Sequence, residues 1–533
     1  MTEISSSILR TTGYPIPEAL QSGSDYTVTL VSGSGYLTLE SKRNPNGFYT
    51  YPANFASTTE VDMADRSLVS GNFISAGYLG DNFISGSLVF TPARDLPANE
   101  ILVKIATFST SSYVEIGSAG DTTSFITTWR TTTSNESITI PTTGGGYNYN
   151  ITTSDGQTFN GVSGNQTITF ASAGDYDVSI SGIFPRIFFN DGGDKTKLID
   201  IKQWGNIVWS SFVSAFNGCS NLTGSFTDAP NLTNVTSFIS TFQDCSSFNQ
   251  PIGNWDVSNV TTIRYMFVRS SFNQPLNNWD VSSVIDMVGV FFQASSFNQD
   301  ISDWDVSNVT NMSYMFYLAV LFNQPLDNWN VSNVTNMLGM FKNSSFDYPL
   351  NSWDVSNVTN MGEMFRNTPF DHPLNSWDVS NVTNMGKMFR NSSFDHPLNN
   401  WNVSNVTNMG EMFNQSSFNQ PLNNWDVSNV TNMFTMFYLN NSFNQDVSDW
   451  DITSVTDFRF FATSATFSTS NYDAILIGWE ATLQAAFPNG SGYTPSITID
   501  FGTSKYTGGG AAAAAHASLG SVFGWSIVDG GIA

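Results

Sequence analysis

Apolar residues recur in a fixed order through the middle of the chain. Tryptophans stand 24 or 25 residues apart from Trp255 to Trp450, and each is followed by Asp or Asn and then by Val or Ile. Within one copy, the segment from Leu350 to Val355 has the apolar spacing of a leucine-rich-repeat strand. The apolar positions that follow it at intervals of three to four residues predict one face of a short helical turn, and they are Val358, Met361, Met364 and Phe365.

A single copy of this length is too small to bury its own aromatic side chains. Burying one such side chain contributes roughly 1.5 to 3 kcal/mol, so the copies are stable only where neighbouring copies cover one another. We therefore predict one coil per copy, with equivalent residues stacked in columns. The predicted fold class is mainly β with short helical turns: a leucine-rich-repeat-type solenoid over residues 191–470, with N-terminal β domains and a C-terminal α/β cap.

The chain around the repeats predicts three further units. Residues 1–122 alternate short apolar runs with Gly, Ser and Pro, which predicts a β domain. Residues 123–190 contain short strands between Gly-rich turns, the pattern of a small β-sandwich. Residues 471–533 form a capping unit in which the segments from Tyr472 to Leu483 and from Ala511 to Leu519 suit helices.

Two segments resemble known families. The stretch SSFNQPLNNWDVSNVTNM, followed by Met-Phe, is similar to the BspA-like family of bacterial surface proteins, and the resemblance covers roughly residues 190–533. That family has leucine-rich-type repeats of 25 residues and occurs in secreted, lipid-anchored and phage-encoded proteins, so the resemblance implies adhesion outside a cell and no catalytic residues. The segment AGDYDVSI from Ala173 resembles the last strand of polycystic-kidney-disease-type (PKD) modules, whose usual Trp-Gly-Asp-Gly is Thr-Ser-Asp-Gly here, from Thr153.

Charge and motifs limit the classes of function. The chain has 19 Lys and Arg against 44 Asp and Glu, a net charge of -25, which disfavours nucleic acids and anionic membranes as partners. No apolar run is long enough to span a membrane, and no secretory signal is readable at the N-terminus. No phosphate-binding loop, nucleophile elbow or zinc-protease motif is present, so we expect a protein that is not an enzyme.

The residues that follow the tryptophans form an acidic row. Stacked coils would hold these side chains roughly 5 Å apart, the spacing of neighbouring strands. Either calcium bridges the carboxylates, or each accepts a hydrogen bond from the backbone of its own turn. Asn at two places favours the hydrogen bond, because an amide oxygen accepts it without charge. The row is Asp256, Asp280, Asp305, Asn330, Asp354, Asp378, Asn402, Asp426 and Asp451. No other cofactor is expected.

Three central copies differ from the rest at positions that we expect to be exposed. Where other copies have Asn-Gln, they carry Asp347-Tyr348, Asp371-His372 and Asp395-His396, and a cation follows the apolar pair at Lys342, Arg366 and Arg390. At the positions of these cations, outer copies carry Phe292, Tyr317 and Tyr438, with Tyr265 and Tyr314 close by. A charged centre flanked by aromatic residues predicts a recognition surface. The alternative is that the aspartates and arginines only neutralise each other on a solvated face.

The histidines and cysteines raise further alternatives. His372 and His396 would bind a metal only if both rings converged on one ion with carboxylates, and we predict no metal site. Cys219 and Cys245 occupy matching places in neighbouring copies, where stacking permits either a disulfide or two buried thiols. Eight Asn-Val-Thr sequons, the first at Asn234, are interpreted as turn residues.

The leading hypothesis is a phage protein of the virion, of the fibre, decoration or receptor-binding type. Residues 1–122 would attach to other virion proteins, and the solenoid would meet a glycan or a protein on the host surface. The alternative is a bacterial cell-surface or secreted adhesin of the BspA-like family. Whether the chain forms a homo-oligomer is left open.

Overall fold

The computed structural model describes residues 121–533 and, before them, only the backbone of eight short strands. Residues 1–122 and 123–533 form two separate compact units. In the first unit, sheets of order β6-β1-β8 and β3-β2-β7 and the pair β4-β5 are all antiparallel. The predicted attachment to a particle concerns side chains of residues 1–122, which lie outside the described residues. The strands are β1 (Val28–Leu30), β2 (Tyr36–Ser41), β3 (Asn44–Pro52), β4 (Glu60–Asp62), β5 (Ser70–Asn72), β6 (Gly86–Leu88), β7 (Ile101–Ala106) and β8 (Val114–Ile116).

The second unit begins with two packed sheets. A six-stranded sheet has the order β12-β11-β14-β9-β15-β16, and β10 pairs with β13. Alternate residues of β11, such as Tyr149 and Ile151, are buried because successive side chains of a strand point to opposite faces. β15 pairs with β9 on one side and parallel with β16 on the other, so this sheet covers the first coil of the repeats. The strands are β9 (Phe125–Thr131), β10 (Glu136–Ile140), β11 (Asn148–Thr153), β12 (Thr158–Val162), β13 (Gln166–Phe170), β14 (Gly174–Ile183), β15 (Leu198–Gln203) and β16 (Thr223–Gly224).

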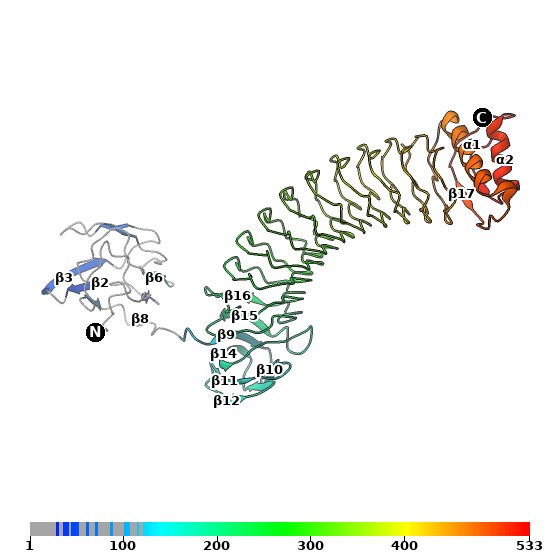
Figure 1. Ribbon diagram of the computed structural model, residues 1–533. Coiled ribbons are helices and arrows are strands. Elements are labelled where there is room, and N and C mark those ends of the chain that lie inside the picture. Colours follow the sequence, from blue (N-terminus) through cyan, green and yellow to red (C-terminus); the bar gives the residue numbers. More distant parts are fainter. Residues whose placement is uncertain are drawn as a thin grey trace. The chain divides into compact units, whose positions relative to one another are not determined.

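The repeats build a curved stack of coils, one coil per copy (Figure 1). Single parallel bridges join equivalent residues of neighbouring coils, from the pair Ser237 and Thr262 to the pair Asn432 and Asp457. The structure describes every residue between 225 and 468. This range contains no helix and no strand longer than a single bridged residue. The described residues are therefore mainly β with few helices, and the repeat units are held together by bridges and turns.

The strand and the helical turn predicted within each copy are both wrong. Trp353 N donates to Leu350 O of the same coil at 3.1 Å, which makes the segment Leu350 to Val355 a turn. The segment predicted to be helical instead bonds to the next coil, because Met361 N donates to Asn384 O at 3.0 Å and Asn367 N donates to Arg390 O at 2.9 Å. We call residues 360–367 and their equivalents the ladder segment, and the surface that the ladder segments share is called the ladder face.

Left-handed backbone conformations explain why the ladder segment is not helical. Glu363 has a φ of 60° and Asn367 a φ of 55°, and the equivalent residues of the neighbouring coils are left-handed too. Each such residue ends a helical run, because L-residues in a right-handed helix need negative φ. The result is a series of tight turns in which alternate N–H groups point to the next coil.

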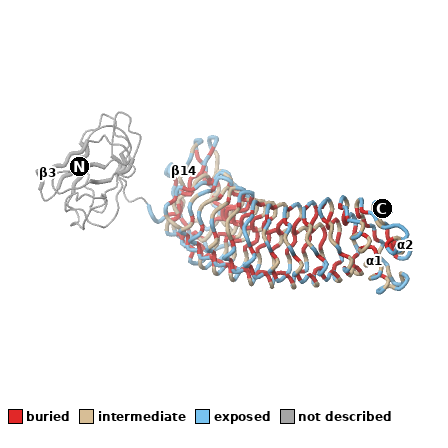
Figure 2. Tube along the Cα trace, turned by 90° about the horizontal axis from the view of Figure 1, so that it is seen from above, coloured by how far each residue is buried: buried red, intermediate tan, exposed pale blue. Residues whose placement is uncertain are grey.

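The core of the stack consists of columns of equivalent side chains, as predicted. Trp353 and Trp377 lie parallel with ring centroids 6.5 Å apart, and Phe365 and Phe389 stack at 5.8 Å. From Trp279 to Trp450, each indole N–H of the column donates to a carbonyl of the preceding coil, as from Trp377 Nε1 to Leu350 O at 2.9 Å. Figure 2 shows the buried residues recurring at the same place in coil after coil. The Trp and Phe columns thus bind each coil to its neighbours.

The C-terminal residues close the exposed end of the stack. The helices expected from the sequence are α1 and α2, which pack on each other at the last coil (Figure 1). The elements are α1 (Thr469–Ala486), the short 3-10 helix η1 (Pro488–Gly490), β17 (Thr498–Asp500), α2 (Ala511–Ser521) and β18 (Ser526–Val528). Neither they nor any other helix in the described part of the chain has the length and apolar content that a membrane crossing requires.

Candidate binding groove on the ladder face

Three consecutive coils carry glycine at one outward position of the ladder segment. These residues are Gly362, Gly386 and Gly410, while the coils on either side carry Leu338 and Phe434 at the same position. None of the three glycines has positive φ, so the backbone conformation does not require them. A Cβ atom at Gly386 would lie 2.7 Å from Nδ2 of Asn408 in the next coil. The glycines are therefore explained by close approach of that amide.

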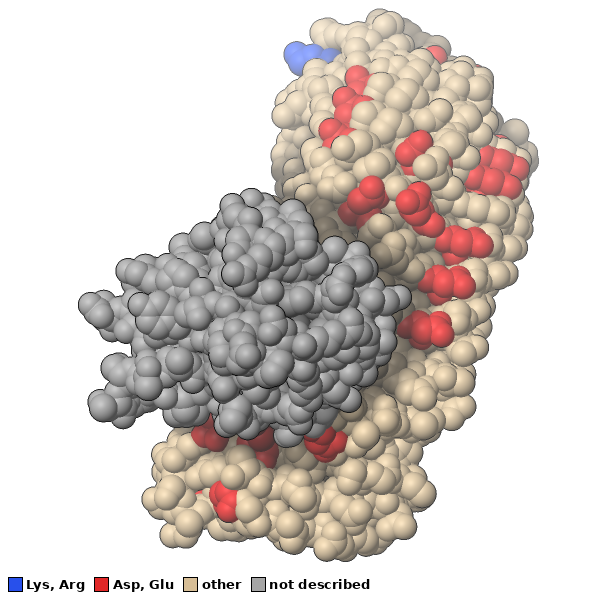
Figure 3. All heavy atoms as spheres, turned by 90° about the vertical axis from the view of Figure 1, so that its left-hand side faces the viewer, with Lys and Arg blue, Asp and Glu red and all other residues tan. Residues whose placement is uncertain are grey.

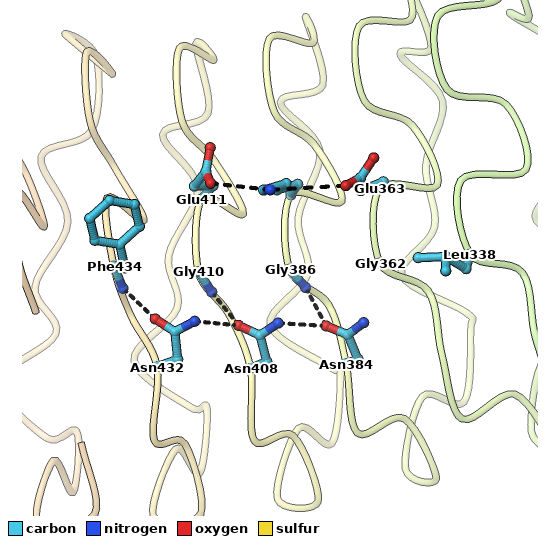
Figure 4. Close-up of a pocket in the computed structure, with 11 residues that line it drawn as sticks. Leu338, Gly362, Glu363, Asn384, Gly386, Asn408, Gly410, Glu411, Asn432 and Phe434 are labelled. Carbon is cyan, nitrogen blue, oxygen red and sulfur yellow. Dashed lines mark hydrogen bonds and ion pairs between the residues drawn. The ribbon is translucent and has the colours of Figure 1, made fainter. Parts of the chain in front are cut away.

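A ladder of asparagine side chains runs where these glycines leave space (Figure 4). Asn384 Nδ2 donates to Asn360 Oδ1 at 2.9 Å, Asn408 Nδ2 to Asn384 Oδ1 at 2.8 Å, and Asn432 Nδ2 to Asn408 Oδ1 at 2.9 Å. Each Oδ1 also accepts the N–H two residues further on, as from Gly386 N to Asn384 Oδ1 at 3.1 Å. One hydrogen of each of these three Nδ2 groups keeps no protein partner among the described residues.

Glycines and amides together form the floor of a shallow groove. The groove has a volume of about 220 Å³ and ends at Leu338 on one side and at Phe434 on the other. Glu363, Lys387 and Glu411 form one wall, and the lysine lies between the two carboxylates (Figure 4). Apolar ends, hydrogen-bonding groups along the floor and charges on a wall are typical of a site that orients a polar ligand.

Six charged side chains form a network along this wall. Glu363 pairs with Lys342, with Arg366 at 3.4 Å and with Lys387 at 4.0 Å. Glu411 pairs with Arg390 and, at 3.4 Å, with Lys387. Lys342, Arg366 and Arg390 pair with the two glutamates but do not line the groove, whose own charged side chains are Glu363, Lys387 and Glu411. On the face drawn in Figure 3, by contrast, acidic side chains form a broken row and lysine and arginine are almost absent.

The cations of the network act on the ionisation of Glu363. Burial works to raise the pKa of the Glu363 carboxyl, but Lys342, Arg366 and Lys387 outweigh burial and hold that pKa below its ordinary value. Nearby, burial and the charge of Glu363 raise the pKa of Tyr314. Both groups therefore keep their usual charge at neutral pH, with Glu363 ionised and Tyr314 neutral.

Aromatic residues continue the ladder face on the N-terminal side of the groove. Phe292 and Tyr317 have ring centroids 4.6 Å apart, and Tyr314 lies 5.9 Å from Tyr317. Lys342 Nζ lies 4.9 Å from the centroid of the Tyr317 ring, so a cation–π contact joins the aromatic group to the charged wall. Beyond the other end, Arg459 lies over the Phe434 ring, and Tyr438 is half-buried.

The aspartates and histidines of the central copies are not part of this network. His372 Nε2 lies 3.1 Å from Asp347 Oδ1 and His396 Nε2 lies 3.3 Å from Asp371 Oδ1, each bridging to the preceding coil. The alternative that these aspartates neutralise the arginines is wrong, because Arg366 and Arg390 pair with Glu363 and Glu411 instead. Two further predicted residues also lie outside the network. Asp395 Oδ1 accepts a hydrogen bond from Asn419 N at 2.8 Å, and the Tyr348 side chain is exposed.

Each histidine ring therefore pairs with a different aspartate, and the two rings do not converge on one site. In the described part of the chain, no group of three or more His, Cys, Asp or Glu is placed to hold a metal ion. The predicted recognition residues thus divide into two sets. One is the aromatic and cationic set of the ladder face, and the other is a separate row that consists of the Asp–His pairs, Asp395 and Tyr348.

The acidic row after the tryptophans makes the local hydrogen bonds that the sequence favoured over calcium. Ser380 N donates to Asp378 Oδ1 at 3.0 Å, and Ser404 N donates to Asn402 Oδ1 at 3.2 Å in the same geometry. Because Asp and Asn play the same part, the row is explained by turns of the backbone. The sequon asparagines also serve the backbone, as Asn357 Nδ2 donates to Ser332 O of the preceding coil at 2.7 Å.

The two cysteines are free and buried in the first coils. Cys245 Sγ donates to Phe216 O at 3.1 Å, and burial raises the pKa of both thiols. A raised pKa disfavours the reactive thiolate, so these residues act as small core side chains.

Sequence reasoning found the cations and aromatics of the ladder face but missed the groove itself. Its floor and inner wall consist of Gly362, Gly386, Gly410, Asn384, Asn408, Asn432, Glu363, Lys387 and Glu411. The available signal was glycine at one position in three consecutive copies, flanked by Leu338 and Phe434. Three successive glycines indicate a hollow only when their position in the coil is known to face outward. A helical turn was predicted for this segment, and a helix would orient the glycines differently.

Two other hollows are weaker candidates for a binding site. The larger, of about 700 Å³, lies where the sandwich meets the first coils, and its two cations are already paired, Lys202 with Asp177 at 2.8 Å and Arg130 with Asp175 at 2.7 Å. The other, of about 480 Å³, is an open hollow beside Phe226, Pro251 and Pro275. Neither has a row of equivalent amides along its floor as the groove has.

Comparison with known proteins identifies the repeats. One family matches four overlapping stretches, residues 186–289, 210–324, 268–375 and 367–474, which together cover more than half of the chain. The search of curated proteins and the search of solved structures each found no match. The chain therefore belongs to the family described as Mycoplasma protein of unknown function, DUF285.

Proposed function

We propose that the chain is a non-enzymatic adhesion protein that uses the ladder face of its coil stack to bind a molecule on a cell surface. The observation that carries the proposal is where the copies differ. The core residues Trp353, Met361 and Phe365 recur in neighbouring coils, whereas the outward positions of Gly362, Glu363 and Arg366 change from coil to coil. Packing fixes the core, so the outward positions are free to carry specificity.

The proposal includes a finer structural assignment. The period of the coils and the helical cap support a leucine-rich-repeat-type solenoid of the BspA-like kind. The two packed antiparallel sheets formed by β9 to β14 support a PKD-like sandwich. In this arrangement the sandwich covers one end of the solenoid and the ladder face stays open to a partner.

Two settings compete for the protein. In the first, the chain is a virion protein of the fibre, decoration or receptor-binding type, held on the particle through residues 1–122. In the second, it is a bacterial cell-surface or secreted adhesin, which the word Mycoplasma in the family description favours. Mass spectrometry of purified phage particles and of the surface fraction of producing cells decides between them. Detection in particles supports the first setting, and detection only in the surface fraction overturns it.

Binding of the fluorescently labelled full chain to whole cells tests the adhesive function. The test variant replaces Lys387→Thr and Arg390→Tyr, the residues that Thr435 and Tyr438 provide at the same positions of another coil. Because the fold already accommodates these side chains there, the coil should stay intact. We expect cells that bind the wild-type chain to lose most of the signal with this variant.

A second variant serves as the matched control. It replaces Asp371→Asn and His372→Gln, the pair that Asn273 and Gln274 form in an earlier coil, and so alters the other surface of the same coils. We expect it to bind cells like the wild type. Equal loss in both variants, or full binding by the Lys387 and Arg390 variant, would show that the ladder face is not the adhesive surface.

A further inference from the structure

The hydrogen-bond ladder of the coil stack continues into the C-terminal cap. Ala462 N of the last coil donates to Asp500 O in β17 at 2.8 Å. Phe501 N then donates to Val528 O in β18, also at 2.8 Å. Residues 526–533, which we call the terminal rung, therefore take the place of a next ladder segment. On the far side of β18, no strand of the described residues pairs with it.

The free edge of the terminal rung presents backbone groups without partners. Ser526 and Val528 bond to β17, as from Ser526 N to Ile497 O at 2.8 Å. The backbone groups of successive residues in a strand point to opposite sides, so those of Ile527 and Asp529 point to the free edge. The structure gives neither of these two N–H groups a hydrogen bond to a described residue. The ladder thus ends in an edge that can accept one more strand.

This edge carries exposed apolar side chains and no protecting residue. Val528 is 51% exposed and Ile532 is 61% exposed, and no large apolar side chain in the described residues is more exposed than Ile532. Edge strands are commonly protected by lysine or proline, but the terminal rung contains neither. Its only charged side chain, Asp529, accepts a hydrogen bond from Tyr472 OH at 2.6 Å. The edge is therefore suited to pairing with another strand.

The other end of the ladder indicates that the partner is a second copy of the chain. There, Asn190 N donates to Ser214 O in the ladder segment of the first coil at 3.1 Å. The loop that covers this coil is itself bonded to the sandwich, because Phe188 N donates to Pro141 O at 3.2 Å. Copies therefore cannot add head to tail through the ladder, which would produce an open filament. A two-fold contact between identical free edges remains, and such a contact is self-complementary.

We infer that two copies of the chain pair antiparallel through their terminal rungs, about a two-fold axis at Val528. In this register, Ile527 of one copy faces Asp529 of the other, and their outward N–H and C=O groups exchange hydrogen bonds. The two Val528 side chains meet as a non-hydrogen-bonded pair, in which the Cα atoms lie about 4.5 Å apart. The Asp529 carboxylates do not oppose the contact, because each is bonded to Tyr472 of its own copy.

Pairing of this kind keeps both ladder faces on the same side of the dimer. The two-fold axis between antiparallel strands of one sheet is perpendicular to the sheet, so neither face is turned over. Two ladder faces on one side can engage the same surface together, and linked binding of two sites raises the overall affinity. The dimer goes beyond the proposed adhesive function and does not depend on it.

Sedimentation velocity of the full chain tests whether the dimer forms. We expect the boundary to shift from monomer to dimer as the protein concentration rises to about 0.3 mM, since an interface this small gives weak affinity. The dimer should become tighter as salt is raised, because salt screens the repulsion between two chains of charge -25. A monomer at every concentration, or a dimer that weakens with salt, would overturn the inference.

A matched pair of lysine variants locates the contact. Val528→Lys places a charge on the free edge, whereas Val208→Lys places one in the first coils, on a valine that is likewise 51% exposed. We expect Val528→Lys to shift the midpoint of dimerisation at least about tenfold to higher concentration. Val208→Lys should dimerise like the wild type. Equal midpoints for the two variants would show that the terminal rung is not the contact.

Disulfide trapping tests the register of the two strands. Val528→Cys places two thiols across the two-fold axis at a spacing that a disulfide can bridge, so we expect mild oxidation to give a covalent dimer on a non-reducing gel. Val208→Cys and the wild-type chain should stay uncrosslinked, because the native Cys219 and Cys245 are buried. A dimer in sedimentation that Val528→Cys fails to trap would contradict the inferred pairing.

Discussion

Each tryptophan of the repeats both fills the core of its coil and bonds that coil to the one before it. Trp377 Nε1 donates to Leu350 O at 2.9 Å and Trp401 Nε1 donates to Leu374 O at 3.0 Å. Trp255 stands at the start of the column, and its Nε1 is buried without a partner. The same side chain therefore occurs with and without the hydrogen bond.

Replacing these tryptophans by phenylalanine separates the bond from the packing. Trp377→Phe and Trp255→Phe lose similar apolar volume, but only Trp377→Phe loses a hydrogen bond. We expect Trp377→Phe and Trp401→Phe to lower the free energy of unfolding by about 1 kcal/mol more than Trp255→Phe does, as measured by urea denaturation. Equal losses in all three variants would mean that the indole N–H contributes nothing net.

Gly386 allows a second residue-scale test, in which two effects have opposite signs. Gly→Ala substitutions usually stabilise by about 0.4 to 1 kcal/mol, because they restrict the unfolded chain. A Cβ atom here would lie 2.7 Å from Asn408 Nδ2 and would displace that amide from its 2.8 Å bond with Asn384. We expect Gly386→Ala to destabilise by about 1 kcal/mol net.

Ser313 provides the control for that substitution, since it occupies the same position in a coil without the Asn ladder. Its hydroxyl makes no hydrogen bond with the described residues, so Ser313→Ala should change the midpoint of urea unfolding little. Stabilisation by Gly386→Ala would show that the Asn ladder adds no net stability.

At the scale of elements, α1 ends the stack by imitating the next coil. In the last coil, Gln445 Nε2 donates to Asn419 O of the coil before it at 2.9 Å, and Asn471 Nδ2 of α1 donates in the same way to Asn444 O at 2.8 Å. Trp479 Nε1 then donates to Val447 O at 2.9 Å, which continues the tryptophan column into the helix. The helix thus satisfies the carbonyls that one more coil would have bonded.

This imitation predicts a local effect for Asn471→Ala. Loss of its bond to Asn444 should lower hydrogen-exchange protection of the backbone amides in the last coil, while amides of the central coils keep theirs, because coils depend mainly on their neighbours. Asn423→Ala removes an exposed amide that donates within its own turn, to Asn424 Oδ1 at 3.2 Å, and should leave both regions unchanged. Uniform loss of protection along the stack would contradict the local role of α1.

The elements also show where sequence reasoning succeeds and where it stops. The period of the tryptophans predicted the stacking and its columns, because burial alone imposes them. The spacing of Val358, Met361 and Met364 fits a helix equally well, and only the left-handed φ at Glu363 and Asn367 decides against it. Gly289 and Gly339 at the Glu363 position hinted at positive φ, but a glutamate there gives no such signal. The groove was missed for the same reason.

At the scale of the whole molecule, charge makes stability depend on pH in two ways. Protonating carboxylates relieves the self-repulsion of a chain with a net charge of -25, which favours the folded state as pH falls. Protonating Glu363 works in the opposite direction, because its cationic partners hold its pKa in the folded chain below the ordinary value of about 4.3. A group of this kind contributes stability above its unfolded pKa and loses that contribution as pH falls through the lower folded pKa.

Comparing the wild type with Glu363→Gln isolates the second effect, because the general repulsion is nearly the same in both chains. We expect the variant to be less stable than the wild type at neutral pH and the difference in unfolding free energy to shrink as pH falls below about 4. Asp256→Asn is the comparison, since Asn330 and Asn402 hold the same turn in other coils. Hydrogen bonds from Ser258 alone hold the pKa of Asp256 below its ordinary value, so a smaller pH-dependent change of the same sign is expected. A difference for Glu363→Gln that stays constant down to acidic pH would mean that Lys342, Arg366 and Lys387 do not stabilise the ionised carboxylate, and the ion pairs of this network would then contribute nothing to the stability of the coils.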